Sequence, residues 1–240
     1  TLEGGGYRFD GGMRQFEERT EAIRILQKDG SFTEKTFKVR HSAHGPVVAE
    51  KGGKALAFRV VSLDRPHVLE QYWLMGRAKN LKQFETASSM LQMPMFTTMY
   101  ADRDGHIMHL FGGATPVRKT GDWNFWSKAA PGDSSSTLWT SIHPYNELPK
   151  VIDPPSGWLQ NANDPPWTTT FPLALDPGKF PPYMAPRRME FRPQRSARIV
   201  DEDSSITFDE LVAYKQSTRL ELADRVLPEV VEAAKAQGQT

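Results

Sequence analysis

The stretch GWLQNANDPPW, residues 157–167, holds the side chains of this sequence that are best suited to chemistry. Asn161 and Asn163 stand two positions apart at the end of a strand-like run, which Pro165 and Pro166 stop. Side chains of a strand alternate with a period of two, so both amides would share one face of an extended chain. An amide NH2 donates hydrogen bonds without carrying a charge. The pair therefore predicts either a binding face or a turn that caps a strand end.

Two pairs of histidines repeat one spacing, His41 with His44 and His106 with His109. Three-residue spacing would align each pair on one face of a helix, where the two rings could share a metal ion. Both pairs fall in segments with extended patterns, where residues three apart point to opposite faces. The spacing therefore does not favour a metal site.

The common catalytic motifs are missing from this sequence. It contains no GxSxG elbow, no phosphate-binding P-loop and no GxGxxG fingerprint. It also contains no cysteine, which excludes disulfides, thiolate metal ligands and a cysteine nucleophile. The run Ser134–Ser136 is most simply a solvated loop. The residues alone thus name no nucleophile.

Extended segments and one helical region are predicted before residue 116. FEERTEAIRIL and SFTEKTFKVR flank the turn at Asp29–Gly30 and predict a hairpin. HGPVVAE and ALAFRVVSL favour further strands through their β-branched and aromatic residues. Periodicity from Val68 to Leu91 is helical, and MFTTMYADRDGHIMHLFGG predicts a second hairpin that turns at ADRDG.

Loops and then helices are predicted after residue 116. Residues 114–156 are rich in Gly, Pro and Ser, and residues 164–193 are too rich in proline for a helix or a central strand. Thr207 with Glu210 predicts a capping box, followed by a last amphipathic helix. We expect one domain in three parts: strands and a helix pair over 1–116, long loops with the Asn161/Asn163 strand over 117–193, and helices over 194–240. Strands first and helices last indicate an α+β fold.

Composition bounds the function only weakly. The 240 residues are 38% hydrophobic and 25% charged, with a net charge of +1. No block of one charge suggests a nucleic-acid partner, and no apolar run approaches the length of a membrane span. Electrostatics therefore nominate no ligand, nucleic acid or membrane.

Five motifs in order carry a resemblance to a known family. They are RTEAIRI, HGPVV, YADRDGHIMHLFGGATPVR, LPKVIDPPSGWLQNAND and RSARI. Together they resemble the β chain of the penicillin acylase family, within the N-terminal nucleophile hydrolases. The resemblance covers nearly the whole chain from Tyr7 onward. It implies an antiparallel sheet with C-terminal helices, as part of a four-layer αββα fold.

The resemblance also implies a reaction and a nucleophile. Family members hydrolyse a linear amide, such as that of a β-lactam nucleus or an acyl homoserine lactone, through an acyl-enzyme. The attacking group is an N-terminal serine released when a precursor cleaves itself, and its own α-amino group, with a pKa near about 8, serves as base. The motifs place that serine upstream of Thr1, so we expect the α chain and the first part of the β chain to be missing. We therefore expect that Thr1 is not the nucleophile and that this chain alone is inactive, with an active enzyme that uses Thr1 as the rival.

Site residues follow from the same resemblance. Asn163 matches the asparagine whose amide completes the oxyanion hole, and Asn161 matches its companion at the substrate. Arg195 matches an arginine that organises the site, with Arg198 as the competitor. Thr98 and Ile107 match positions that line the acyl pocket, although they could equally be ordinary core residues.

Some expectations concern the parent protein. It would be periplasmic or secreted, by resemblance alone, and no cofactor is expected in this chain. A calcium ion remains open for the parent, with no ligands identified here. Gly105-His106-Ile107 replaces the usual Gly-Asn-Ile, and Asp164 replaces a second asparagine, so the substrate stays undetermined. The alternative to a catalytic fragment is a non-catalytic binding module built on the same scaffold.

Overall fold

The computed structural model describes residues 1–238 and divides the chain into two compact units. Unit 1 comprises residues 1–65 and 116–143, and unit 2 comprises residues 66–115 and 144–240. These boundaries differ from the three-part division expected from the sequence. The reason is that residues 116–143 return to the N-terminal strands: Asp10 N donates to Asp133 O at 2.8 Å, and Pro116 bridges Ile142 within the same unit.

Unit 1 contains two antiparallel sheets. The small sheet has the order β1 (Leu2–Glu3), β2 (Gly6–Phe9) and β3 (Gly12–Arg14). The larger sheet has the order β4 (Glu17–Leu26), β5 (Phe32–Ser42), β6 (Gly45–Lys51) and β7 (Lys54–Ala57). The predicted first hairpin is β4–β5, in register from Glu17↔His41 to Leu26↔Phe32. Residues 116–143 add the short helices α3 (Trp123–Trp126) and η1 (Ser135–Thr137).

Unit 2 is built around a three-stranded antiparallel sheet of order β10-β9-β8. The predicted second hairpin is β8 (Thr98–Ala101) with β9 (Ile107–Leu110), and β10 (Lys150–Ile152) pairs with β9. Most of the buried apolar side chains in the described chain lie here, including Met108 and Leu110 of β9, Val151 of β10 and Trp167. The core of the described chain is therefore centred on β9.

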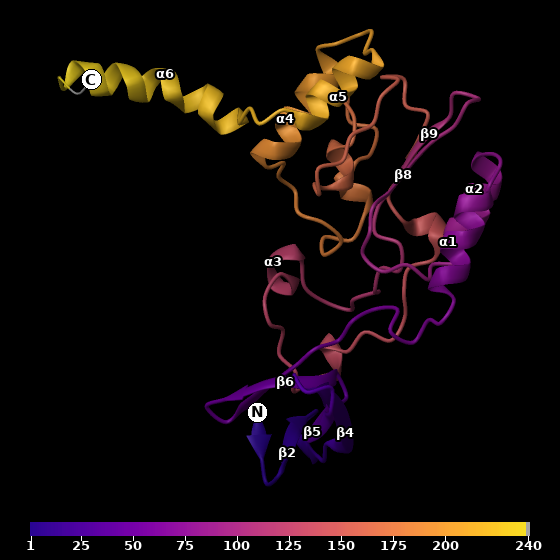
Figure 1. Cartoon of the computed structure of the whole chain (residues 1–240), viewed down its shortest axis with the longest axis vertical. Coiled ribbons are helices and arrows are strands. Elements are labelled where there is room, and N and C mark those ends of the chain that lie inside the picture. The colour runs from indigo at the N-terminus through magenta and orange to yellow at the C-terminus, as the bar shows by residue number, and fades with distance from the viewer. Residues whose placement is uncertain (239–240) are drawn as a thin grey trace. The chain divides into compact units, whose positions relative to one another are not determined.

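The helical region before this sheet consists of two helices. α1 (Val68–Arg77) and α2 (Leu81–Ser88) pack against each other, as Figure 1 shows. The continuous periodicity from Val68 to Leu91 is interrupted because Ala78 is extended and Asn80 caps α2, its side chain accepting from Gln83 N at 3.0 Å. Asparagine is a preferred N-cap because its oxygen satisfies an unpaired amide of the first turn.

Short helical turns and three helices complete unit 2. The turns are η2 (Tyr145–Glu147), η3 (Pro166–Thr168) and η4 (Pro177–Lys179), and the helices are α4 (Phe191–Asp201), α5 (Phe208–Gln216) and α6 (Glu221–Ala236). The capping box of Thr207 with Glu210 is present at the start of α5. The described helices are all too short or too polar to cross a lipid bilayer. Antiparallel sheets followed by helices confirm the α+β class.

Candidate functional site

The loop that carries Asn161 and Asn163 begins after β10 and ends at η3. No strand includes either residue, so the predicted extended run with two amides on one face is not formed. Instead, Asn161 Oδ1 accepts from Asn163 N at 3.2 Å, and Asn163 adopts a left-handed backbone with φ of +62°. Asparagine tolerates this conformation because its side chain can bond to the nearby backbone. Local turn chemistry therefore replaces the strand.

The side chain of Asp164 stabilises this turn through hydrogen bonds. Its buried carboxylate accepts from Gln160 Nε2 at 2.7 Å, from Thr168 Oγ1 at 2.5 Å and from Ala162 N at 2.8 Å. Gln160 and Thr169 also pair through their backbones, with Gln160 N donating to Thr169 O at 2.8 Å. A buried carboxylate with three donors is strongly localised, because moving it would leave those donors unpaired. The turn with Asn161 and Asn163 is thus fixed by residues that are themselves buried.

The Asn163 side chain is exposed, and its amide oxygen accepts a hydrogen bond. Its Oδ1 accepts from Arg192 Nη2 at 3.1 Å, and Arg192 belongs to α4. Among residues 1–238, no acceptor is found for Asn163 Nδ2. Because the arginine occupies the oxygen, the NH2 group remains free to donate to another molecule.

Arg195 and Arg198 occupy different environments on α4. Arg198 pairs with Glu221 at 2.8 Å and with Glu202 at 3.7 Å, and the Glu221 side chain is almost wholly buried. Arg195 lines a cavity of about 700 Å³ together with Asn161, and its buried Nε has no hydrogen-bond partner in the described chain. The structure therefore brings Arg195 and Asn161 together and engages Arg198 in joining α4 to α6.

Thr98 and Ile107 do not meet at this cavity. They lie at opposite ends of the β8–β9 ribbon, where Thr98 pairs with Leu110 and Ile107 pairs with Ala101. Both side chains are half-buried. The backbone N of Ile107 is held by Asp153 Oδ1 at 2.8 Å. Their assignment to an acyl pocket stays a prediction.

His109, considered from the sequence only as half of a disfavoured metal-binding pair, is a functional candidate in the structure. It lies in β9 with 0% exposure, and neither ring nitrogen has a hydrogen-bond partner within residues 1–238. Burial lowers its pKa to about 4, against a smaller opposing effect of the Asp164 charge. The ring is therefore neutral at pH 7. Within the described residues, Gln160 Oε1 is also buried without a partner, and its side chain donates to Asp164 through Nε2.

His106 differs from His109, its partner in the sequence pair, in both exposure and the direction of its pKa shift. Its Nδ1 lies 2.7 Å from Asp153 Oδ2 on the exposed side of the hairpin. The hydrogen bond with Asp153 raises the pKa of His106 and lowers that of Asp153. No group of three His, Asp or Glu side chains placed to hold a metal occurs among the described residues.

The residues that position the amides were missed by sequence reasoning. Gln160, Asp164, Thr168 and Arg192 all act on the Asn161–Asn163 turn, yet none stands out by type. One signal was available for Asp164, because an aspartate before a proline favours a turn over a strand. Arg192 gave none, since its contact joins residues 29 positions apart in sequence.

Comparisons with known proteins place this geometry in context. Residues 1–240 match the sequence profile of a protein family described as penicillin amidase. The penicillin acylase 2 proenzyme of Pseudomonas sp. (strain SE83) is 29% identical over 210 residues, which are 84% of this chain and 26% of that protein. The acyl-homoserine lactone acylase PvdQ of Pseudomonas fluorescens (strain Pf0-1) is 24% identical over 184 residues, 67% of this chain and 23% of that protein. The chain thus spans about a quarter of these relatives.

A solved structure shares the fold. It is the thermostable penicillin G acylase from Alcaligenes faecalis in orthorhombic form, with a TM-score of 0.68 and 22% identity. The match covers 89% of this chain and 36% of that one. This likeness establishes the architecture, and the loop geometry above stands on the present structure.

Proposed function

This chain belongs to the penicillin amidase family of N-terminal nucleophile hydrolases, and from that premise we propose that it supplies the oxyanion-stabilising part of an amidohydrolase. The observation that carries the proposal is the Asn163 amide, whose oxygen is held by Arg192 and whose NH2 is free. Amide hydrolysis needs such a donor because the carbonyl oxygen gains negative charge when the nucleophile attacks.

Asn163 would stabilise that charge through an uncharged donor. The amide adds no charge of its own to a site whose base is an α-amino group with a pKa near about 8, and the positive charge beside it is that of Arg192, which is bonded to the amide oxygen. One oxyanion donor is worth about 3 kcal/mol in the transition state. The Asp164 network supports this role, because a donor held in place beforehand needs no reorganisation during the reaction.

The attacking group would come from outside these 240 residues. We assign it to an N-terminal serine of the parent protein, whose hydroxyl forms the acyl-enzyme while its amino group accepts the proton. Further segments of the parent, an α chain and the start of the β chain, would then be this chain's partners. The proposal is supported by relatives about four times as long as the matched region.

The substrate is proposed as a class. Relatives are named for penicillin and for acyl-homoserine lactones, so a linear amide between an acyl group and a cyclic amine-bearing nucleus is the common denominator. Asn161 and Arg195 would contact or orient that substrate from the cavity that they share. Thr98 and Ile107 would line the acyl end. A periplasmic or secreted parent, matured from a precursor, accords with such substrates.

Substitution of Asn163 in the full-length protein tests the central claim. Asn163→Ala should lower kcat roughly a hundredfold with little change in KM, because the lost donor acts mainly in the transition state. Asn124→Ala changes an exposed amide of α3 in unit 1 and is the matched control, expected to leave kcat unchanged. An unchanged kcat for Asn163→Ala would remove this residue from the mechanism.

A second experiment separates the alternatives for this chain. The isolated 240-residue chain should not hydrolyse a chromogenic phenylacetyl amide. Turnover that Thr1→Ala abolishes would make Thr1 the nucleophile and overturn the proposal. Full-length protein that binds amides without turnover would instead identify a non-catalytic binding module.

A further inference from the structure

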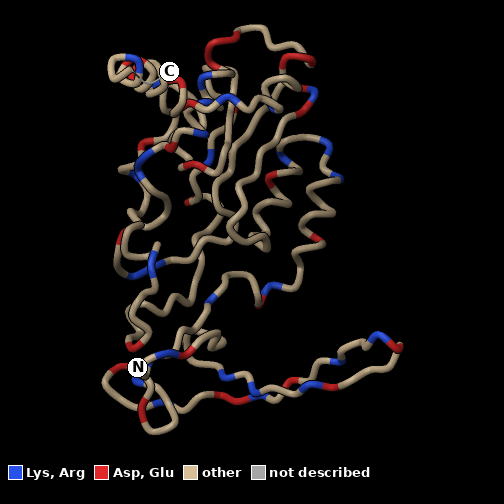
Figure 2. Tube along the Cα trace, turned by 60° about the vertical axis from the view of Figure 1, so that its left-hand side comes forward, with Lys and Arg blue, Asp and Glu red and all other residues tan. Residues whose placement is uncertain are grey.

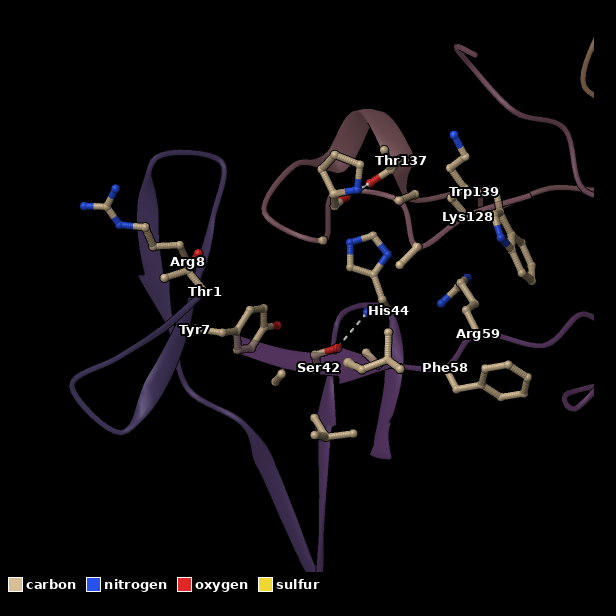
Figure 3. Close-up of a pocket in the computed structure, with 18 of the residues that line it drawn as sticks. Thr1, Tyr7, Arg8, Ser42, His44, Phe58, Arg59, Lys128, Thr137 and Trp139 are labelled. Atoms are coloured by element: carbon tan, nitrogen blue, oxygen red, sulfur yellow. Dashed lines mark hydrogen bonds between the residues drawn. The ribbon is translucent and has the colours of Figure 1, made fainter. Parts of the chain in front are cut away.

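A cavity of about 480 Å³ lies within unit 1, and its lining includes no residue of the Asn163 loop. Figure 3 shows its walls: the ends of β2, β5 and β7 on one side and the segment from Lys128 to Trp139 on the other. Its aromatic lining consists of Tyr7, Phe16, Phe58, Trp126 and Trp139. A cavity of this size with apolar walls matches the usual dimensions of a small-molecule site.

The charges around this cavity are one-sided. Its lining contains the basic residues Arg8, Arg59, Arg118 and Lys128 and no aspartate or glutamate. Arg8 is paired with Glu3, which does not line the cavity, at 2.8 Å. An adjoining hollow adds two lysines and a single acid, Asp133. Like charges gathered at a concave surface repel one another and create a positive potential that an anion would relieve.

Two of these arginines are held against tryptophan rings. The Arg59 guanidinium lies 4.4 Å from the centroid of Trp139, and that of Arg118 lies 4.4 Å from the centroid of Trp126. Arg59 Nη1 also donates to Ala43 O at 3.2 Å. A stacked guanidinium has its plane fixed, and the N–H groups of Arg59 beyond the one bonded to Ala43 O stay able to bond a carboxylate. The Arg59 side of the lining is thus held in place before a ligand arrives.

His44 supplies a polar atom without a partner. Figure 3 shows its ring projecting into the cavity between Tyr7, Thr137 and Trp139. Its Nε2 is buried and has no hydrogen-bond partner among residues 1–238. Burial, and next the charge of Arg59, lowers the pKa of His44 against the smaller opposing effect of a backbone hydrogen bond with Gly132, so the ring is neutral at pH 7. A buried nitrogen left unpaired is costly, and a ligand oxygen would satisfy it.

We propose that this cavity binds a small organic anion, a carboxylate attached to an aromatic or branched apolar body. The carboxylate bonds Arg59 and the His44 ring, and the apolar body packs on Trp139 and Phe58. This assignment is independent of amide hydrolysis, because it uses no residue of the Asn163 loop or of α4.

Binding of 3-phenylpropanoate to the full 240-residue chain is the direct test. Its neutral isostere, 3-phenylpropanamide, has the same shape without the charge. We expect the acid to shift the NMR signals of the His44 ring and the Trp139 indole, with a dissociation constant at least tenfold lower than that of the amide. Equal affinity for the acid and the amide would overturn the proposal, as would no shift at either ring.

Matched arginine variants identify the carboxylate contact. Arg59→Gln should weaken binding of the acid about tenfold and leave the amide unaffected. Arg24→Gln is the control, since that guanidinium also lies 4.4 Å over an aromatic ring, Phe32, but outside the cavity. Arg59→Lys should restore part of the affinity, and circular dichroism verifies the folding of each variant. Equal losses in Arg59→Gln and Arg24→Gln would show general charge attraction and contradict a built site.

Discussion

The hairpins β4–β5 and β8–β9 turn through the same residue types and end in opposite surroundings. Asp29 and Gly30 form the first turn, and Asp102 through Gly105 form the second. Every residue of β4 is exposed, whereas Met108 and Leu110 of β9 are buried. Figure 2 shows positive and negative residues interspersed along the long β4–β5 ribbon. Turn chemistry thus determines that a hairpin forms, and other segments determine what covers it.

The histidine rings show the same dependence on what covers a residue. His44 faces a cavity of unit 1, and His109 is enclosed in the core of unit 2. Burial lowers the pKa of both rings. His106, three residues before His109, has its pKa raised by Asp153 instead. The pKa values of His106 and His109, three residues apart, therefore shift in opposite directions, because the neighbours of each ring come from distant segments.

The largest expected contrast between the hairpins is in packing. Leu110→Ala should lower the free energy of unfolding by about 3 kcal/mol, because a side chain with 2% exposure leaves a cavity when it is truncated. Ile25→Ala in β4, with 43% exposure, is the matched change and should cost less than about 1 kcal/mol. Urea denaturation of both variants measures the difference. Similar losses would mean that β4 is covered in solution.

The second contrast is a pH dependence that comes from His109. Its pKa is about 4 in the folded chain and 6.5 for the ordinary group, so the unfolded chain takes up the proton first as the pH falls. The stability present above pH 6.5 is therefore lost as the pH falls from 6.5 to about 4, by about 3 kcal/mol at about 1.4 kcal/mol per pH unit. His109→Leu should remove this loss in urea titrations at pH 7 and pH 4.5.

His106→Gln is the control for that pH dependence and should act with the opposite sign. The raised pKa of His106 contributes stability that is present below pH 6.5 and is lost as the pH rises through the raised value. The His106→Gln variant should therefore still lose stability at low pH through the protonation of His109. If His109→Leu lost as much stability between pH 7 and pH 4.5 as the unsubstituted chain, the lowered pKa of His109 would be contradicted.

The smallest contrast concerns the turns themselves. Asp102 accepts from Tyr100 Oη at 2.7 Å and from the amides of Asp104 and His106, each at 3.0 Å. Among the described residues, the Asp29 side chain accepts only from Ser31, through its amide at 3.0 Å and its hydroxyl at 2.7 Å. Asp102→Ala should lower Tm more than Asp29→Ala, and both less than Leu110→Ala, because exposed carboxylates exchange these bonds for water. Equal shifts in thermal scans would contradict the ranking.

Local signals predicted much of the fold. Both hairpins, the helix pair and the Thr207 capping box follow from residues within a few positions of one another. The strand through Asn161 and Asn163 was predicted wrongly because alternation suggested an extended chain. The Asp164 carboxylate, held by Gln160 and Thr168, bends it into a turn instead. Alternation carries no information about a buried acceptor that competes for the backbone.

The sequence by itself determined most of the elements and the α+β class, while the role of Asn163 stays a prediction from the family resemblance. These depend on turn propensity, periodicity and motif order, which are properties of short segments. Only the tertiary structure decided which half of the Asn163 amide is free, because Arg192 reaches it from α4. It alone also gathered His44, Arg59 and Trp139 around one cavity. Burial and charge come from contacts between distant segments, so no local pattern contains them.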